Sequence, residues 1–565
     1  MIFQGKSNLK RIFLIGFLIC LILLSSSTLN QSYKFEELIK AQISEVKTPK
    51  FLPPLPDSPF SINSLSGFQT YSSKGDGSLN NPFIIENYAI NASGYPPLIG
   101  ISIFWTTHYF EIRNCIISGG WCGISFQEIA PNTAKIYNNK IISNGYGIRI
   151  LDSPNQKIES NFISDCHYHG ISCYTGGSNM IIYNNTIEFC DSNGIAVEKS
   201  NNSYIMENKI SNSDVGIHVK NVSLVEIEEN ILTNCTNAGI FLSYLYNCTI
   251  NSNVLNKNDR GLCLWYCKEC LVFGNNCSLN VEKGIESNYN EYLDFANNRL
   301  DGDGFVLSDD NFTRLFTLTI NNTNNYVNGK LVKLFKNIDS LTITSNYGQI
   351  FFMNCSIINI NNILIDQTSQ AITMFNCSDI IIDSVDILDC VNGIRIYDSI
   401  GISLKNCFFE RNENGFATSQ SILIDITDNL FIENYMGLVH YKSNGCLIKT
   451  NKFQSNTMYA IVLVESKFTT IYHNDFIDNG DGTYSQALDS SGYANYWYNI
   501  TLQEGNYWSD WLGVGNYEIS SNGYVVDEYP LSVPFVPELN QNLSLVLIIG
   551  FISLLSLVFI ACRRR

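Results

Sequence analysis

Charged residues are scarce in this 565-residue chain, and basic residues are the scarcer kind. Asp and Glu number 52 against 35 Lys and Arg, charged residues make up 15% of the chain, and the net charge is −17. No stretch gathers Lys and Arg into the basic stripe that a phosphate backbone requires. The sequence therefore argues against a nucleic-acid partner, and solubility accounts for the acidic balance.

Histidine and methionine are also rare, with six and seven residues. Clusters that bind soft metals are built from His, Cys and Met side chains. The one His-x-His pair is His167 with His169. The sequence therefore gives little support to copper handling, and no cofactor is predicted.

A helical pattern is missing from the central part of the chain. No long stretch between Gly100 and Ile461 repeats its apolar residues every 3.6 positions, which excludes helical and leucine-rich repeats. Apolar residues nevertheless make up 45% of the chain, so a large core can be buried.

What the sequence does contain is a repeat of about 23 residues, marked by a small residue followed by an apolar one. From Gly100 to Ala460 this period gives about sixteen turns. The small residues are Gly100, Gly123, Gly147, Gly170, Gly194, Gly216, Gly239, Gly261, Gly284, Gly304, Ala371, Gly393, Gly415, Gly437 and Ala460.

An asparagine series keeps the same period. Its members are Asn139, Asn161, Asn185, Asn208, Asn230, Asn253, Asn275, Asn406, Asn429, Asn451 and Asn474. Asparagine tolerates left-handed turns, and stacked amides can hydrogen-bond along a ladder. Short alternating segments rich in Ile, Val, Phe and Tyr lie between the marks and indicate strands with one buried face. These features predict an all-β fold, a right-handed single-stranded parallel β-helix, whereas a propeller needs about twice the period.

Non-periodic segments flank the repeats, where the strand edges at the ends of a coil need covering. We expect an N-terminal cap at residues 53–99, the repeats at 100–483 and a C-terminal cap at 484–534.

Both ends of the chain carry apolar runs. Residues 1–27 combine basic residues, a short apolar run and three serines, which predicts a secretory signal peptide or an N-terminal anchor, followed by a linker at 28–52. After a linker at 535–542, residues 543–562 form an uncharged apolar run that predicts a transmembrane helix, with the basic tail 563–565 in the cytoplasm.

These ends predict a cell-membrane protein with one pass and a large extracellular domain, or with two passes if the N-terminal segment is not cleaved. Asn-x-Ser/Thr triplets, for example at Asn91 and Asn184, agree weakly with a glycosylated exterior.

The periodic core resembles the NosD-type carbohydrate-binding and sugar-hydrolase repeats of archaeal surface proteins. The opening segment 75–87 reads GDGSLNNPFIIEN, the middle segment 327–337 reads VNGKLVKLFKN and precedes GQIFFMNCS at 348–356, and the closing segment 505–511 reads GNYWSDW and precedes DEYPL at 527–531. The resemblance spans roughly residues 55–533 and implies a right-handed β-helix. It leaves activity open, because the group contains enzymes, binders and structural proteins.

Sixteen of the 18 cysteines lie outside the terminal apolar runs. Cys263, Cys267 and Cys270 have a spacing seen among iron–sulfur ligands, but many cysteines keep a fixed phase in the repeat. Phase-locked cysteines are expected to be small apolar residues stacked inside the coil. Disulfides between neighbouring turns and a metal site remain alternatives.

The best acid/base candidates are Asp165, His167, His169 and Asp191, because Asp191 falls at the phase of His167 one turn later. The alternative is a polar surface turn. From the sequence we expect no Arg or Lys beside this cluster to neutralise a uronate.

Four aspartates close to the shortened turn at Gly304 are candidate Ca²⁺ ligands, with a solvated loop as the alternative. These are Asp301, Asp303, Asp309 and Asp310. The chain also has 31 Tyr, 33 Phe and 6 Trp, and exposed aromatic rings can stack on sugars.

We therefore expect a cell-surface β-helix whose role is non-enzymatic: glycan binding, adhesion or envelope structure, with a polysaccharide or surface glycan as partner. The first alternative is a polysaccharide-active lyase, hydrolase or epimerase. The second is a NosD-like accessory protein for metal-site maturation.

Overall fold

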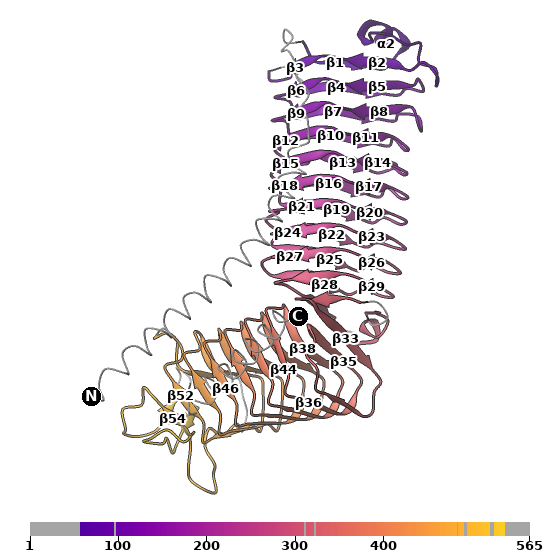
Figure 1. Cartoon of the computed structure of the whole chain (residues 1–565). Coiled ribbons are helices and arrows are strands. Elements are labelled where there is room, and N and C mark those ends of the chain that lie inside the picture. The colour runs from indigo at the N-terminus through magenta and orange to yellow at the C-terminus, as the bar shows by residue number, and fades with distance from the viewer. Residues whose placement is uncertain are drawn as a thin grey trace, which may run out of the picture. The chain divides into compact units, whose positions relative to one another are not determined.

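The computed structural model describes residues 57–94, 98–309, 312–320, 324–482, 484–490, 494–519 and 525–536. In this part of the chain the helices are α2 (Leu65–Tyr71) and α3 (Phe312–Leu315), and the other regular elements are strands. The strands wind into a right-handed parallel coil of about 17 turns (Figure 1). The predicted parallel β-helix is therefore confirmed.

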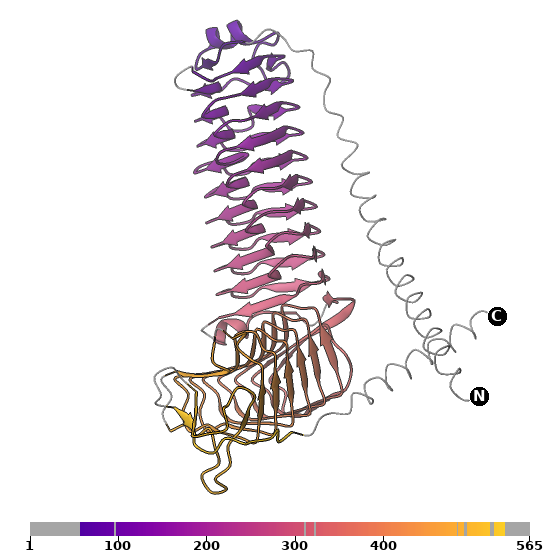
Figure 2. The same ribbon diagram turned by 90° about the vertical axis from the view of Figure 1, so that its left-hand side faces the viewer.

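Each turn of the first stack contributes one strand to each of three sheets, and Figure 2 shows the turns lying one above the other. Sheet I consists of β1 (Phe60–Ile62), β4 (Ile99–Phe104), β7 (Cys122–Gln127), β10 (Tyr146–Leu151), β13 (Ile171–Tyr174), β16 (Asn193–Glu198), β19 (Val215–Lys220), β22 (Ala238–Ser243), β25 (Arg260–Trp265), β28 (Lys283–Asn288) and β31 (Phe305–Ser308). Sheet II consists of β2 (Phe83–Glu86), β5 (Phe110–Arg113), β8 (Ala134–Tyr137), β11 (Lys157–Glu159), β14 (Ile181–Tyr183), β17 (Tyr204–Met206), β20 (Glu226–Glu228), β23 (Thr249–Asn251), β26 (Leu271–Phe273) and β29 (Asp294–Ala296). Sheet III consists of β3 (Ala89–Asn91), β6 (Ile116–Ser118), β9 (Lys140–Ile142), β12 (Phe162–Cys166), β15 (Thr186–Cys190), β18 (Lys209–Ser211), β21 (Ile231–Thr233), β24 (Val254–Asn256), β27 (Asn276–Ser278), β30 (Arg299–Asp301) and β32 (Tyr326–Val327).

The second stack repeats this arrangement after β32 pairs antiparallel with β33. Sheet IV consists of β33 (Lys330–Lys336), β35 (Gln349–Met353), β38 (Gln370–Phe375), β41 (Asn392–Tyr397), β44 (Asn414–Ser419), β47 (Met436–Tyr441), β50 (Tyr459–Val464) and β53 (Ala487–Ser490). Sheet V consists of β34 (Leu341–Ile343), β36 (Ser356–Asn361), β39 (Ser378–Asp383), β42 (Ile400–Lys405), β45 (Ile422–Thr427), β48 (Leu447–Lys449) and β51 (Thr470–Tyr472). Sheet VI consists of β37 (Leu364–Asp366), β40 (Asp386–Leu388), β43 (Phe408–Glu410), β46 (Leu430–Ile432), β49 (Lys452–Gln454), β52 (Asp475–Ile477) and β54 (Tyr507–Trp508). A short antiparallel pair follows, made of β55 (Tyr517–Glu518) and β56 (Val526–Asp527).

The first turn of the coil lies inside the segment predicted as an N-terminal cap. Phe60, Ser61 and Ile62 of β1 pair in parallel with the start of the repeats on β4. This turn lacks the glycine–isoleucine mark, so the coil is longer than the sixteen turns predicted. Helix α2 lies at this end of the stack (Figure 1), and its buried Phe68 stacks on Phe83 with 4.9 Å between the ring centroids.

The predicted asparagine ladder runs through the interior. In the first stack each Nδ2 donates to the Oδ1 of the asparagine one turn later, at 2.9–3.0 Å, without a break from Asn139 to Asn325. Most of these Nδ2 groups also donate to two backbone carbonyls, as Asn230 does to Ile205 and Glu228. The ladder thus satisfies buried backbone groups at each corner that it occupies.

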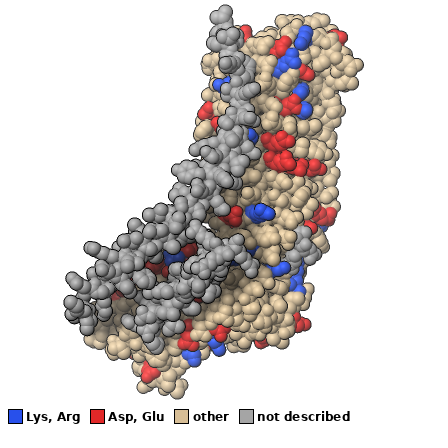
Figure 3. All heavy atoms as spheres, in the orientation of Figure 1, with Lys and Arg blue, Asp and Glu red and all other residues tan. Residues whose placement is uncertain are grey.

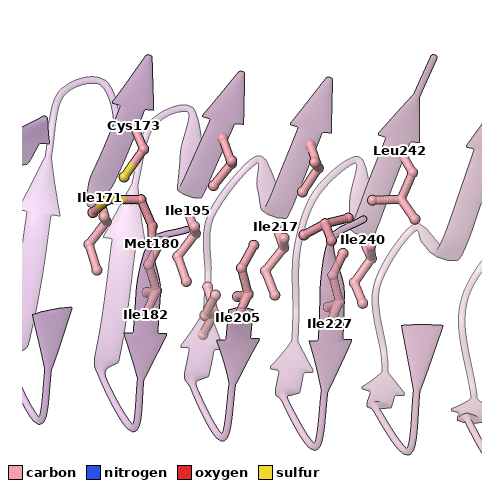
Figure 4. Close-up of a cluster of buried hydrophobic side chains, with 14 of the residues drawn as sticks. Ile171, Cys173, Met180, Ile182, Ile195, Ile205, Ile217, Ile227, Ile240 and Leu242 are labelled. Atoms are coloured by element: carbon pink, nitrogen blue, oxygen red, sulfur yellow. The ribbon is translucent and has the colours of Figure 1, made fainter. Parts of the chain in front are cut away.

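Stacked aliphatic side chains fill the coil between the sheets. Figure 4 shows Ile171, Ile195, Ile217 and Ile240 of sheet I in one column. In the second stack an aromatic column replaces part of this filling, with ring centroids 4.0–5.3 Å apart. Its members are Phe409, Phe431, Phe453, Phe476 and Trp508. Each repeat therefore buries its apolar face only against its neighbours.

All sixteen described cysteines are buried free thiols, which confirms the predicted burial. Burial raises the pKa of several of them to about 12, for example Cys115 and Cys173. Their state in the cell stays a prediction.

Two further predictions fall on parts of the chain that the structure does not describe, namely the N-terminal segment 1–27 and the transmembrane helix 543–562. Within the described ranges, no helix has the length and apolar character needed to cross a membrane. Uncharged residues make up most of the described surface that Figure 3 shows, and Asp and Glu side chains gather in one group on the first stack.

Candidate functional site

The predicted acid/base cluster lies on the turn between β12 of sheet III and β13 of sheet I. The structure brings His167 and Asp191 together across one turn, with 2.7 Å between Nδ1 and Oδ2. Their side chains are 80% and 66% exposed. This pair is therefore a solvated surface contact.

His169 lies closer to the sheet and is held by two hydrogen bonds. The backbone N–H of Asn193 donates to its Nδ1 at 3.2 Å, so the ring proton sits on Nε2, which faces the Tyr174 hydroxyl at 3.1 Å. Burial, with a smaller contribution from His218, lowers the pKa of His169 to about 4. The ring is therefore neutral near pH 7.

Asp165 does not join either histidine. Its backbone is left-handed, with φ of 55°, its side chain is exposed, and its carboxylate accepts a hydrogen bond from the Ser164 hydroxyl at 2.8 Å. The four predicted residues thus form one exposed pair, one half-buried histidine and one separate aspartate.

Three aromatic rings on successive turns lie beside this cluster, and we call Trp121, Tyr146 and Tyr168 the aromatic strip. The Trp121 and Tyr146 rings meet edge to face at 5.2 Å, and Tyr146 stacks on Tyr168 at 5.1 Å. Tyr146 also contacts the edge of His169 at 5.5 Å. Trp121 is 39% exposed and Tyr168 is 45% exposed. Part of each ring therefore packs against the protein, and part is accessible to solvent.

Arg149 of β10 lies beside the aromatic strip. The sequence alone did not indicate this contact. Its guanidinium carbon lies 5.2 Å from the Trp121 ring and 5.7 Å from the Tyr146 ring. Arg149 reaches the cluster only through Tyr146, which contacts His169, so the expectation that no Arg or Lys falls beside the cluster stays a prediction. The position of Arg149 within its repeat is the signal that could have indicated its contact with the strip. Arg149 and Ser172 each lie two residues after the glycine of their repeat and pair in register, and Ser172 lies three residues after His169.

A second aromatic group lies where strands of sheet I end. Tyr244, Tyr266 and Tyr289 stack almost parallel, with centroids 5.0 Å and 4.8 Å apart. Because these rings lie face to face, the stack hides most of its ring faces and offers mainly edges.

The four aspartates predicted as Ca²⁺ ligands do not form one site in the described part of the chain. Asp303 is buried and accepts a 2.7 Å hydrogen bond from Asn280 Nδ2 inside the coil. Asp309 pairs with Arg314 at 2.9 Å, Asp301 is exposed, and Asp310 lies outside the described residues. No three His, Cys, Asp or Glu residues of the described ranges are grouped so that they could hold a metal ion.

Two family models match the chain in different parts. The model of right-handed β-helix regions matches residues 100–188 and 128–266, and the model of the periplasmic copper-binding protein NosD matches residues 316–513. Together these matches support the similarity of the chain to NosD-like β-helix repeat proteins. The resemblance seen in the sequence is thereby confirmed, and no curated protein sequence matches this NosD-like chain.

Solved structures share the fold at low identity. The tailspike protein of E. coli bacteriophage HK620 in complex with a pentasaccharide is 11% identical, covers 80% of this chain and 78% of its own, and has a TM-score of 0.32. The catalytic domain of a GH87 α-1,3-glucanase with nigerose is 12% identical over 79% and 70% of the two chains, with a TM-score of 0.27. A mutant of the periplasmic alginate epimerase AlgG is 9% identical over 74% and 85%, with a TM-score of 0.23. These likenesses concern the fold alone.

Copper, which the NosD description implies, does not fit the residues that match that model. Of their two histidines, His440 is fully buried beside the Thr418 hydroxyl, and burial lowers its pKa to about 3. His473 instead lies 2.6 Å from the carboxylate of Glu504. The cysteines of this segment are buried core residues. The described histidines and cysteines of this segment are thus not gathered at an accessible point.

Proposed function

We propose that this NosD-like chain is a non-enzymatic, cell-surface glycan-binding protein whose docking surface is the aromatic strip. The observation that supports the proposal most is the contact chain from Trp121 through Tyr146 to Tyr168 on three successive turns. Pyranose rings present flat apolar faces, and exposed aromatic rings are the side chains that pack on them.

The strip suits binding because its rings are held in place before a ligand arrives. Tyr146 is the first residue of β10, and Trp121 directly precedes β7 and accepts a 2.8 Å backbone hydrogen bond from the Tyr146 N–H. The column behind them contains the fully buried Ile124 and Ile148. A preorganised surface loses little conformational entropy when it binds.

The same geometry disfavours acid/base turnover. Both ring nitrogens of His169 are engaged, one by the Asn193 N–H and the other by Tyr174. Burial raises the pKa of Tyr174 above its ordinary value. General acid/base catalysis needs a group within reach of the substrate whose pKa matches the working pH.

A glycan array with the purified full-length chain tests this proposal. We expect binding to a subset of glycans without release of products. Trp121→Ala and Tyr168→Ala should each weaken binding roughly three- to tenfold, the range that one aromatic contact supplies. Trp105→Ala is the matched control, because Trp105 is 63% exposed but lies outside the strip.

Two outcomes would count against the proposal. Binding that is unchanged in both strip variants would move the site elsewhere on the coil. Product formation that His167→Ala abolishes would show that the protein is an enzyme.

A further inference from the structure

We infer that the aromatic strip selects glycans that carry a negative charge, and that Arg149 recognises the anionic group. This inference rests on the proposed function and adds the class of ligand to it.

Arg149 is a cation without a carboxylate partner in the described part of the chain. Its side chain is half-buried between the rings of Trp121 and Tyr146, and its Nε is buried without a hydrogen-bond partner there. Two aromatic faces stabilise a guanidinium while leaving its charge uncompensated. The arginine is thus oriented by the strip and still open to an anion.

Several other arginines in the described part of the chain pair with carboxylates. Arg113 lies 2.9 Å from Glu86, and Arg411 lies 2.7 Å from Asp389. Arg314 lies 2.9 Å from Asp309. Arg149, by contrast, contacts two aromatic rings and pairs with no carboxylate among the described residues.

The residues around Arg149 leave its charge unopposed. Ser125 of β7 and Ser172 of β13 flank it in register, and both are buried and uncharged. The neutral His169 adds no charge near pH 7. Of the two acids of the cluster, Asp191 is engaged by His167 and Asp165 accepts a hydrogen bond from Ser164, and Glu198 lies a turn beyond Tyr174. Arg149 therefore makes the surroundings of the aromatic strip locally cationic, on a chain of net charge −17.

A guanidinium binds carboxylates and sulfates through two parallel hydrogen bonds, which a neutral sugar cannot accept with the same strength. A sugar ring stacked on the exposed face of Tyr168 or Trp121 could place a ring substituent at Arg149. The chemistry shared by the expected ligands is an anionic group on a sugar, either a uronate carboxylate or a sulfate ester.

Matched pairs of polymers test this with the full-length chain. Oligogalacturonate is compared with its methyl ester, and dextran sulfate with dextran, so each pair differs in charge and keeps its backbone. We expect at least one acidic member to bind about tenfold or more tightly than its neutral partner. Arg149→Gln should remove that preference, and Arg149→Lys, which keeps the charge but not the planar fork, should retain part of it. Arg299→Gln is the control, because Arg299 is exposed on β30 and the substitution removes the same charge.

Each outcome has a defined meaning. A preference within the galacturonate pair assigns a carboxylate, and one within the dextran pair assigns a sulfate ester. Equal binding of both members of every pair, or a preference that survives in Arg149→Gln, would overturn the inference. If neutral glycans on the array still bind and Trp121→Ala weakens them, the proposed function stands without it. If no glycan binds at all, both fail.

Discussion

Asp303 occupies a corner of the coil where earlier turns carry asparagine. Asn258 Nδ2 donates to Asn280 Oδ1 at 3.2 Å, and Asn280 Nδ2 donates in turn to Asp303 Oδ2 at 2.7 Å. The second carboxylate oxygen is buried without a hydrogen-bond partner among the described residues. Burial raises the pKa of Asp303 to about 7. The residue is therefore a structural member of a ladder whose protonation state depends on pH.

The raised pKa gives a pH-dependent stability with a definite sign. An aspartate in the unfolded chain titrates near 3.9, so between about pH 4 and pH 7 the folded protein holds a proton that the unfolded chain has released. The contribution of Asp303 to stability is complete below this window and is lost as the pH rises through it. Asp303→Asn supplies an uncharged amide of the same shape. We expect its stability advantage over the wild type to grow from near zero at pH 4 to roughly 2–4 kcal/mol at pH 8.

Urea unfolding midpoints of the two proteins at both pH values measure this difference. An advantage that stays constant with pH, or a variant less stable than the wild type at pH 8, would contradict the assignment.

The sequence could not assign Asp303 to the ladder, for a physical reason. The ladder residues of the two preceding turns lie three and four positions before their glycines, Gly261 and Gly284, whereas Asp303 lies one before Gly304. The shortened turn shifts the phase by about three residues. Because Asp301, Asp309 and Asp310 are near in the sequence, a metal site is the more obvious interpretation. The backbone nevertheless directs the Asp303 side chain into the coil.

At the scale of elements, the ladder fixes the corners between strands of sheets II and III. Asn230 is fully buried, and its Oδ1 accepts both the backbone N–H and the Nδ2 of Asn208. Asn230→Ala would remove the side-chain acceptor of the buried Asn208 backbone N–H and a donor to the Ile205 and Glu228 carbonyls in the interior. We expect a loss of at least roughly 2–4 kcal/mol in the free energy of unfolding.

Asn234→Gly provides the control for this loss, because Asn234 lies four residues later on an exposed turn whose left-handed backbone, with φ of 56°, glycine tolerates. Denaturation of both variants, with hydrogen exchange of the amides around residue 208, checks the expectation. Equal effects of the two substitutions would mean that the ladder amides contribute little.

The series read from the sequence located most of this ladder but misplaced one rung. Asn429, Asn451 and Asn474 hydrogen-bond in sequence at 2.9 Å, yet the rung before them is Cys407, whose N–H donates to Asn429 Oδ1. Asn406 instead has a left-handed backbone, with φ of 51°, and donates to Asp383 on the surface. Periodicity alone cannot separate two adjacent positions when asparagine is favourable at both.

At the scale of the whole molecule, the repeat predicted the architecture better than the site. A fixed period specifies which residues stack on neighbouring turns, so the coil and its core followed from spacing alone. The contact of Arg149 with Trp121 depends on side-chain direction over two neighbouring turns, which spacing does not give. The candidate cluster was therefore placed on the correct turn, while the rings and the cation beside it were not recognised as one surface.

Because each turn contacts only its neighbours, the coil should tolerate the loss of one complete turn. Deleting residues 208–229 removes β18, β19 and β20 and joins Glu207 to Asn230. Asn185 can then donate to Asn230, β15 can pair with β21, and β16 with β22, since these strands share one register. We expect a folded protein with a β-sheet circular dichroism spectrum and cooperative unfolding, and an unchanged aromatic strip, because residues 121–168 lie outside the deletion. Deleting residues 219–229 removes only half a turn. Because β20 is lost, that turn then contributes no strand to sheet II, so this variant should fail to fold. If both deletions behave alike, folded or unfolded, the turns are not interchangeable units and the solenoid is stabilised by longer-range contacts.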